Sequence, residues 1–579
     1  MGPTIYTEPG DSIHIKLVNN LTEPIGPAPP TAVEYWNMLQ NPGEHIKYQR
    51  YKKRVPSPAH LKVDEDNMPR HFDHTNLHLH GLDVQVHMFD PVDTHDPTAP
   101  HINIPPGQCY CYKLDIPSDH PVGMYWYHPH LHGSAAIQMW SGMLGLLYVG
   151  KLTLEKELQK YNVRNTHEFV IWDPAFQYVP NQPTHDLEVD EFLSGQTTLS
   201  KIHPFLVNGQ INPTFTTEVG QVLHFHALCA TVENENTFIV YPEGKQHLHW
   251  NDDQAKIVPF YQIGSDGVMY SKPIKRNVIV MSGGQREELL LIFDKPGRYV
   301  ISQQGIQGMQ FFGMRGHPHD QILATIVVTE ELNDDDKKKE EVVRPTVPIP
   351  SMTFTPGYTD EESVQPENIQ SSETITFSMG ANFDQIPFPQ YYINGHSFSS
   401  SRSQFHAQPN EAREYVLINA NHNAHPFHMH VNRFQIKEMG SELSREEYPV
   451  LNELLDFDEN IWRDTVMVPP NGRARIWVQF KNYTGKTVIH CHFLAHEDTG
   501  MMATLFIGKK DWIFQLEEHY QWMMGVGIGI CLSCLVMYVS RCCLGRQRNL
   551  LKKNNMNDED DDVLYSAVSL NELKSKAMD

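Results

Sequence analysis

Residues 485–502 read GKTVIHCHFLAHEDTGMM, and the first half of this stretch has two counterparts earlier in the chain, GMYWYHPH at 123–130 and GRYVISQQ at 297–304. A second pattern precedes each of the three at a similar distance: IPPGQCYCYKLDI (104–116), MSGGQREELLLIF (281–293) and VPPNGRARIWVQF (468–480). A third pattern, earlier still, reads EPGDSIHIKLVNN (8–20), EVGQVLHFHALCA (218–230) and QPNEAREYVLINA (408–420). The same order in three places predicts three copies of one domain.

Each copy combines strand-like segments with turns rich in glycine and proline, and no long stretch has the periodicity of a helix. The chain of 579 residues contains 36 glycines and 40 prolines. We therefore predict an all-β fold with three β-sandwich domains, at 1–150, 151–330 and 371–510. Residues 331–370 contain the charged run DDDKKKEE followed by several prolines, and we predict that they form a linker.

Composition limits the classes of function. The chain has 46 Lys and Arg against 70 Asp and Glu, a formal net charge of −24, and no basic stripe outside a short cluster after residue 540. We therefore expect no binding to nucleic acid. Eight cysteines are too few for a disulfide scaffold. At most one bridge is expected among Cys109, Cys111 and Cys229, and the sequence does not choose its partners.

The chain has 33 histidines, and four motifs stand out among them: HLHG (78–81), HPH (128–130), HPFHMH (425–430) and HCH (490–492). All four lie in the first and third copies, whereas the second copy has VIS at 300–302 in place of HCH. Because successive residues of a strand face opposite sides, each His-x-His pair can present two imidazoles to one metal cluster. In HCH, Cys491 faces the other way, so one strand can join two metal centres.

Cys491, with His425, His496 and a weak axial Met501, makes the ligand set typical of a blue-copper site. The eight remaining histidines suit a cluster of several metals between copies one and three; they are His78, His80, His128, His130, His428, His430, His490 and His492. Structural zinc is the alternative, but zinc rarely needs so many histidines across two domains. His224 and His226 of the second copy have no partner motif, and we expect them to be core or surface residues.

With these motifs and WYHPHLHGS (126–134), the chain resembles the three-domain multicopper oxidases (laccases, copper-efflux oxidases and ferroxidases) over about residues 2–508, and bacterial-type members above all. The resemblance implies three cupredoxin-like Greek-key domains and four copper ions. It implies a type 1 copper held by His425, Cys491, His496 and Met501. It also implies a type 2 copper at His78 and His428 and a type 3 pair at the other six histidines: His80, His128, His130, His430, His490 and His492.

The resemblance further implies a reaction in which a reducing substrate gives up electrons one at a time and dioxygen is reduced by four electrons to water. Cys491, His490 and His492 would carry the electrons between the two centres. Proton delivery requires carboxylates near the cluster, and Glu497 matches the acid of similar enzymes. Asp83, Asp90 and Asp96 all compete for a second such role, and the sequence does not decide among them.

The sequence ranks the substrates only loosely. No acid occurs at 421–424, just before His425, which weakens a ferroxidase assignment, and no Met-rich segment suggests a cuprous oxidase. We therefore place a laccase-like oxidase of phenols or aromatic amines first and a membrane-anchored metal-ion oxidase second. A non-catalytic copper-binding or adhesion ectodomain is a third alternative, but it would be favoured by a missing ligand, and none is missing.

Residues 522–540 (WMMGVGIGICLSCLVMYVS) carry no charge and are long enough for one transmembrane helix. Basic residues follow this segment, which predicts a cytosolic tail at 541–579 and an extracytoplasmic ectodomain, at the cell surface or in an endomembrane lumen. Similar iron-oxidising enzymes partner a metal permease. The first ten residues, MGPTIYTEPG, do not form a signal peptide, and we expect the N-terminus to be incomplete.

Overall fold

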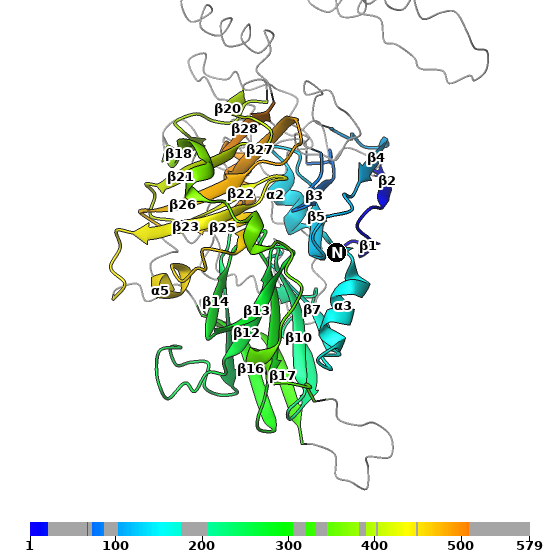
Figure 1. Ribbon diagram of the computed structural model, residues 1–579, viewed down its shortest axis with the longest axis vertical. Coiled ribbons are helices and arrows are strands. Elements are labelled where there is room, and N and C mark those ends of the chain that lie inside the picture. The colour runs from blue at the N-terminus through cyan, green and yellow to red at the C-terminus, as the bar shows by residue number, and fades with distance from the viewer. Residues whose placement is uncertain are drawn as a thin grey trace, which may run out of the picture. The chain divides into compact units, whose positions relative to one another are not determined.

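A computed structural model of the chain describes residues 1–20, 67, 72–85, 102–174, 205–304, 320–330, 344–380, 390–400, 403–446 and 450–508. Within these ranges β-strands predominate and the helices are short (Figure 1), which confirms a mainly β fold. None of the described helices is long and apolar enough to cross a membrane. The predicted membrane helix at 522–540 and the tail at 541–579 lie outside the described residues.

The N-terminal strands form two sheets, one with the order β1-β6-β5-β3 and one that pairs β2 with β4. Exposed and buried side chains alternate along the later part of β4, where Tyr112 and Leu114 enter the core. No bridge forms among Cys109, Cys111 and Cys229, which are free thiols. The elements are β1 (Ile5–Thr7), β2 (Ser12–Val18), β3 (His78–His80), β4 (Cys109–Asp115), β5 (Gly123–His128), α2 (Ala135–Trp140), β6 (Gly145–Val149) and α3 (Lys151–Gln159).

The next strands form two larger sheets, β13-β12-β15-β10-β7-β8 and β14-β11-β16-β17-β9, with a buried apolar core between them. Along β10, Leu223, Phe225 and Ala227 enter this core, so His224 and His226 lie on the opposite face. The strands are β7 (Asn165–Trp172), β8 (Leu206–Val207), β9 (Thr214–Glu218), β10 (Val222–Cys229), β11 (Asn236–Pro242), β12 (Phe260–Ser265), β13 (Val268–Arg276), β14 (Val278–Met281), β15 (Arg286–Ile292), β16 (Gly297–Gln304) and β17 (Asp320–Thr329).

The described part of the predicted linker, 344–370, contains short 3-10 turns and runs into the first strand of the last pair of sheets. These sheets have the orders β19-β18-β21-β26-β23-β24 and β20-β28-β27-β22-β25. The elements are η3 (Ile349–Ser351), η4 (Asp360–Glu362), η5 (Pro366–Asn368), β18 (Ile369–Gly380), β19 (Gln390–Ile393), β20 (Ser403–Ala407), β21 (Ala412–Asn419), β22 (His425–Met429), β23 (Phe434–Ser441), α5 (Val450–Leu454), β24 (Trp462–Arg463), β25 (Thr465–Val468), β26 (Gly472–Gln479), β27 (Gly485–Cys491), α6 (Leu494–Asp498) and β28 (Met502–Ile507).

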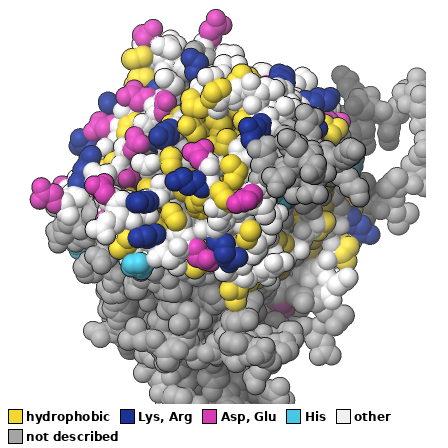
Figure 2. Space-filling model, turned by 90° about the horizontal axis from the view of Figure 1, so that it is seen from below, with side chains coloured by type: hydrophobic (Ala, Val, Ile, Leu, Met, Phe, Trp, Pro, Cys, Tyr) yellow, Lys and Arg dark blue, Asp and Glu magenta, His cyan; other side chains and the backbone are white. Residues whose placement is uncertain are grey.

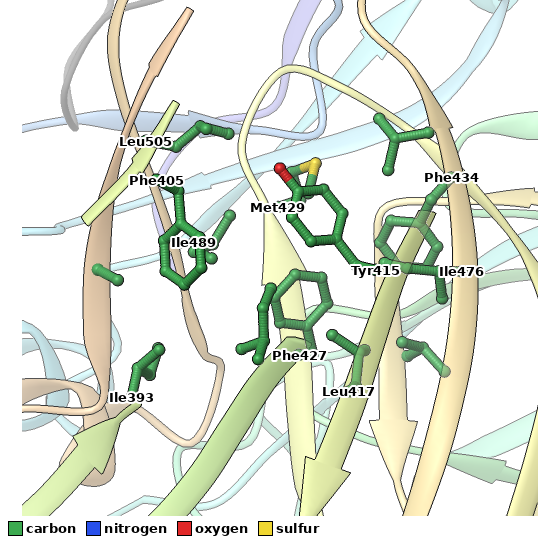
Figure 3. Close-up of a cluster of buried hydrophobic side chains, with 14 of the residues drawn as sticks. Ile393, Phe405, Tyr415, Leu417, Phe427, Met429, Phe434, Ile476, Ile489 and Leu505 are labelled. Atoms are coloured by element: carbon green, nitrogen blue, oxygen red, sulfur yellow. The ribbon is translucent and has the colours of Figure 1, made fainter. Parts of the chain in front are cut away.

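The core of this last pair of sheets sets the direction of the histidines. Phe427 and Met429 of β22 pack into it together with Ile489 of β27 (Figure 3). Because strand side chains alternate, the neighbouring His428 and His490 must face away from that core. The sheets thus come in three successive pairs along the chain, while the predicted domain boundaries stay predictions.

On the face shown in Figure 2, acidic and basic side chains are interspersed, so neither sign of charge dominates there.

Candidate metal centre

The four histidine motifs meet where strands of the first and third copies lie side by side (Figure 1). In the first copy, β3 pairs with β5 so that His78 lies opposite His128. In the third copy, β22 pairs with β27 so that His428 lies opposite His490. Each strand pair therefore supplies imidazoles from two adjacent strands to the same space.

The nitrogen atoms approach one another closely enough for shared metal ions. The Nε2 atom of His130 lies 3.2 Å from Nε2 of His430 and 3.2 Å from Nε2 of His490. On the other side of the cluster, Nε2 of His492 lies 3.3 Å from Nδ1 of His80. Four overlapping triads have all their ligand atoms within 4.8 Å of one another: His78, His80 and His428; His78, His130 and His430; His80, His128 and His492; and His428, His430 and His490.

The protonation state of these histidines fits a metal. Burial lowers the pKa of His128 to about 3 and holds the pKa of His428 well below its usual value, so both rings are neutral. Their Nδ1 atoms donate to backbone carbonyls, of Pro129 at 2.9 Å and of Asp464 at 2.8 Å. Their Nε2 atoms are buried without a hydrogen-bond partner. A carbonyl on one nitrogen and a free lone pair on the other is the arrangement of a metal-binding imidazole.

A second, smaller centre forms on the opposite face of β27. The Sγ atom of Cys491 lies 3.6 Å from Nδ1 of His425 and 3.7 Å from Nδ1 of His496, and the two nitrogens are 3.3 Å apart. All three residues are buried, as is Met501, which accepts through its carbonyl from the Cys491 amide and donates through its own amide to the His496 carbonyl. Burial raises the pKa of the Cys491 thiol well above its usual value, so its thiolate needs a cation such as a metal ion.

The structure therefore brings together the ten histidines and the cysteine that the sequence proposed as copper ligands, and Met501 lies beside them through its backbone hydrogen bonds to Cys491 and His496. His490 and His492 lie in the histidine cluster and Cys491 lies in the smaller centre. The two centres are thus joined by adjacent residues of one strand. The assignment of individual residues to type 1, type 2 and type 3 copper stays a prediction.

Among the predicted acids, Glu497 lies at the cluster. It is fully buried, with one carboxylate oxygen 3.2 Å from Nδ1 of His130 and the other 3.2 Å from Nδ1 of His490. Burial raises its pKa, which favours a form that can hold a proton. Asp83 instead pairs with Arg433 at 3.2 Å and Lys481 at 2.8 Å, and belongs to none of the four histidine triads given above. Asp90 and Asp96 lie outside the described residues.

Asp464, a buried acid between β24 and β25, also lies at the cluster, although no sequence motif predicted it. Its Oδ1 atom lies 3.4 Å from Nε2 of His80, and its carbonyl accepts from His428. The sequence held one signal for Asp464. It directly precedes the uncharged strand TVMV, and an acid at the start of an apolar strand is unusual enough to suggest a role. His224 and His226 are buried, as predicted for core residues, and their rings contact the carboxylate of Glu288.

Comparisons with known proteins agree with this geometry. Two family models, both described as multicopper oxidase, match residues 57–153 and 365–511. The multicopper oxidase mco of Staphylococcus aureus is 22% identical over 88% of this chain and 82% of that protein. A laccase of Bacillus stratosphericus is 22% identical over 83% of this chain and 91% of that protein. The solved structure of a laccase-like multicopper oxidase, CueO from Ochrobactrum sp., has a similar fold, with a TM-score of 0.56 and 19% identity over 88% of this chain and 90% of that one.

Proposed function

Because this chain belongs to the multicopper oxidase family, we propose that it oxidises phenols or aromatic amines, as laccases do, and passes their electrons to dioxygen. The enzyme is a copper oxidoreductase that binds four copper ions. Copper supplies the one-electron chemistry, which no side chain of this protein and no redox-inert zinc ion can supply.

The protein would hold the two copper centres in position, keep water away from the route between them and supply protons. His490 and Cys491, the last two residues of β27, and His492, which directly follows the strand, are buried consecutive residues that would hold the two centres, so electrons would have a short covalent route that excludes water. Glu497 can keep a proton between His130 and His490, within reach of the histidine cluster, and the reduction of oxygen to water consumes protons.

One contact of the His425 ring favours an aromatic substrate over a metal ion. The Nε2 atom of His425 lies 2.8 Å from the side-chain amide of Asn421, which is partly exposed. The outer edge of this ring is therefore bordered by a neutral amide instead of a carboxylate. A neutral border suits an uncharged aromatic donor and gives no attraction to a metal cation.

The test is oxygen consumption by the copper-loaded full-length protein, with a phenol, Fe(II) and Cu(I) offered separately. We expect the phenol to give the highest kcat/KM, and Cys491→Ser to give no uptake with any donor. An Asn421→Asp variant should raise kcat/KM for Fe(II) without a similar gain for the phenol. A kcat/KM for Fe(II) far above that for the phenol in the unaltered protein would overturn the proposal.

A second candidate, oxidation of a metal ion, is favoured by Glu233 of the second copy. Next to the dominant effect of burial, the negative charge of Glu233 raises the pKa of Tyr391 and of Cys491. Tyr391 stacks on His496 with ring centroids 4.0 Å apart. The neighbouring Val232 carbonyl accepts from the Leu494 amide at 2.9 Å, which ties this loop to α6. A Glu233→Gln variant should lower kcat/KM for Fe(II) and leave the phenol unchanged if this candidate is correct.

We also propose that the enzyme is anchored in a membrane by residues 522–540, with its catalytic part extracytoplasmic and a metal permease as partner if the substrate is a metal. The uncharged segment followed by basic residues supports this location. Protease digestion of intact, sealed membrane vesicles should distinguish the two sides, and recovery of the full-length chain in the soluble fraction would contradict the anchor.

A further inference from the structure

The second copy contains no predicted copper ligand, yet one of its loops lies against the histidine cluster. Residues 282–285 precede β15, and the two glycines of this loop pack on His492. A Cβ atom at Gly284 would lie 3.0 Å from Cδ2 of the His492 ring, and one at Gly283 would lie 3.1 Å from the His492 carbonyl oxygen. The loop therefore closes one side of the cluster, and it leads directly to Arg286.

Arg286 is the first residue of β15 and is 1% exposed. Its Nη1 atom donates to Oδ1 of Asp464 at 2.9 Å and its Nη2 atom donates to Oδ2 at 2.8 Å. This two-point geometry fixes the plane of the carboxylate as well as its position. Asp266, also in the second copy, reinforces the arrangement, because its carboxylate accepts from the backbone amides of both Arg286 and Asp464, each at 3.1 Å.

Asp464 in turn contacts imidazoles from two different copies. Its Oδ1 atom lies 3.4 Å from Nε2 of His80 and 3.7 Å from Nδ1 of His428. Its carbonyl accepts from Nδ1 of His428 at 2.8 Å. The rings of His80 and His428 stack with centroids 3.9 Å apart and planes 12° apart. A displacement of Asp464 would therefore move both rings together.

We propose that Arg286 is a positioning residue of the oxygen-reducing centre. It belongs to the copy in which the sequence predicts no copper ligand, and it acts through Asp464 to hold His80 and His428 in the orientation that binds copper. His428 is a predicted type 2 ligand and His80 a predicted type 3 ligand, so the type 2 copper and its neighbour in the type 3 pair should both depend on Arg286, and the type 2 ion is the one that gives a resonance signal. The inference rests on the copper assignment and does not depend on which substrate the enzyme oxidises.

The test compares Arg286→Met with Arg413→Met in the full-length, copper-loaded protein. Arg413 is a suitable control because it is also mostly buried and paired with two carboxylates, Glu411 at 2.8 Å and Glu373 at 3.0 Å, and neither belongs to the histidine triads given above. The measurements are copper per chain, the type 2 signal in electron paramagnetic resonance, and the blue absorption of the type 1 site.

We expect Arg286→Met to weaken copper binding at the type 2 site about 10–100-fold, as the loss of a residue behind a ligand typically does, and to keep the blue absorption. Arg413→Met should keep both signals. Full type 2 occupancy with an unchanged resonance spectrum in Arg286→Met would overturn the proposal. Equal loss of type 1 and type 2 copper would do the same, because it would indicate a purely structural role.

If Arg286→Met does not fold, Arg286→Lys keeps the charge but loses the two-point hydrogen bond, and an altered type 2 spectrum in this variant is the expected result. An unaltered spectrum in Arg286→Lys, together with full copper content, would count against the proposal. These readouts are independent of oxygen uptake, so a preference for Fe(II) over a phenol would refute the proposed substrate and leave this inference standing.

Discussion

Replacing Gly81 by alanine should destabilise the protein far more than the same change at Gly107, although both glycines lie in the first copy at positive φ. Gly81 has φ = 87° and directly follows the HLH strand, and Gly107 has φ = 77°. A Cβ atom at Gly81 would overlap with Nη2 of Arg286 and lie 2.7 Å from Oδ2 of Asp464. At Gly107 a Cβ atom would meet nothing within 4 Å.

The expected magnitude has two parts. Holding an alanine in the left-handed region costs about 1–2 kcal/mol, and this cost applies at both positions. Disrupting a buried ion pair costs about 3–5 kcal/mol, and this cost applies only at Gly81. The sum at Gly81 is about 4–7 kcal/mol, a large share of the roughly 5–15 kcal/mol that stabilises a typical domain.

Urea unfolding of the two apoproteins, followed by tryptophan fluorescence, would measure this difference without a contribution from bound copper. Copper content after reconstitution is the second readout, because Gly81→Ala should also reduce type 2 occupancy by moving Asp464. If both variants lose the same free energy of unfolding, the Arg286–Asp464 pair does not contribute as the structure indicates, and the reasoning is refuted.

Two further changes test other parts of the site, and a third tests a buried carboxylate of the second copy. Cys491→Ser should abolish both the blue absorption and oxygen uptake, since Cys491 supplies the thiolate of its triad with His425 and His496; retained absorption would exclude Cys491 as a ligand. Glu497→Gln keeps the shape but cannot carry a proton, so kcat should fall about 10²–10⁴-fold with copper content unchanged, and a normal kcat would remove Glu497 from proton delivery. Burial opposes ionisation of Glu288, but His226 and His224 hold its pKa at about 2, below the ordinary 4.5. Its carboxylate therefore stabilises the fold above pH 4.5 and loses this effect as the pH falls towards 2. Glu288→Gln should cost on the order of 3 kcal/mol in urea unfolding at neutral pH and flatten the acid dependence, whereas an unchanged pH profile would argue against the ion pair.

The sequence predicted the candidate site better than it predicted what surrounds the site. His-x-His spacing within strands is a local property, and the alternation of side chains was enough to separate Cys491 from His490 and His492. The two centres could therefore be proposed from the amino-acid sequence alone. The mainly β fold followed from the same kind of local signal, namely repeated strand patterns between glycine and proline turns.

The acids were harder to predict because their roles depend on contacts between distant parts of the chain. Asp83 follows HLHG closely and was a natural candidate, but the structure places it in an ion pair with Arg433. Asp464 is far from any histidine motif in the sequence, and only the pairing of β22 with β25 brings it beside His428. Glu233 was missed for the same reason, since the contact that ties its loop to α6 crosses from one copy to another.

The second copy shows how a repeat without predicted metal ligands can still contribute to the surroundings of the metal centre. Its strand at 297–304 has no histidine, and nothing in that motif hints at a role. The strand that precedes it in the sequence, β15, however, begins with Arg286, whose two hydrogen bonds to Asp464 cross from the second copy to the third. A buried carboxylate beside uncharged imidazoles needs a fixed positive charge, and Arg286 of the second copy supplies one at 2.8 Å, closer than Arg433 of the third copy at 3.5 Å. The second copy therefore contributes a charge as well as packing contacts to the surroundings of the centre, and a side chain at the glycine after HLH would collide with its arginine.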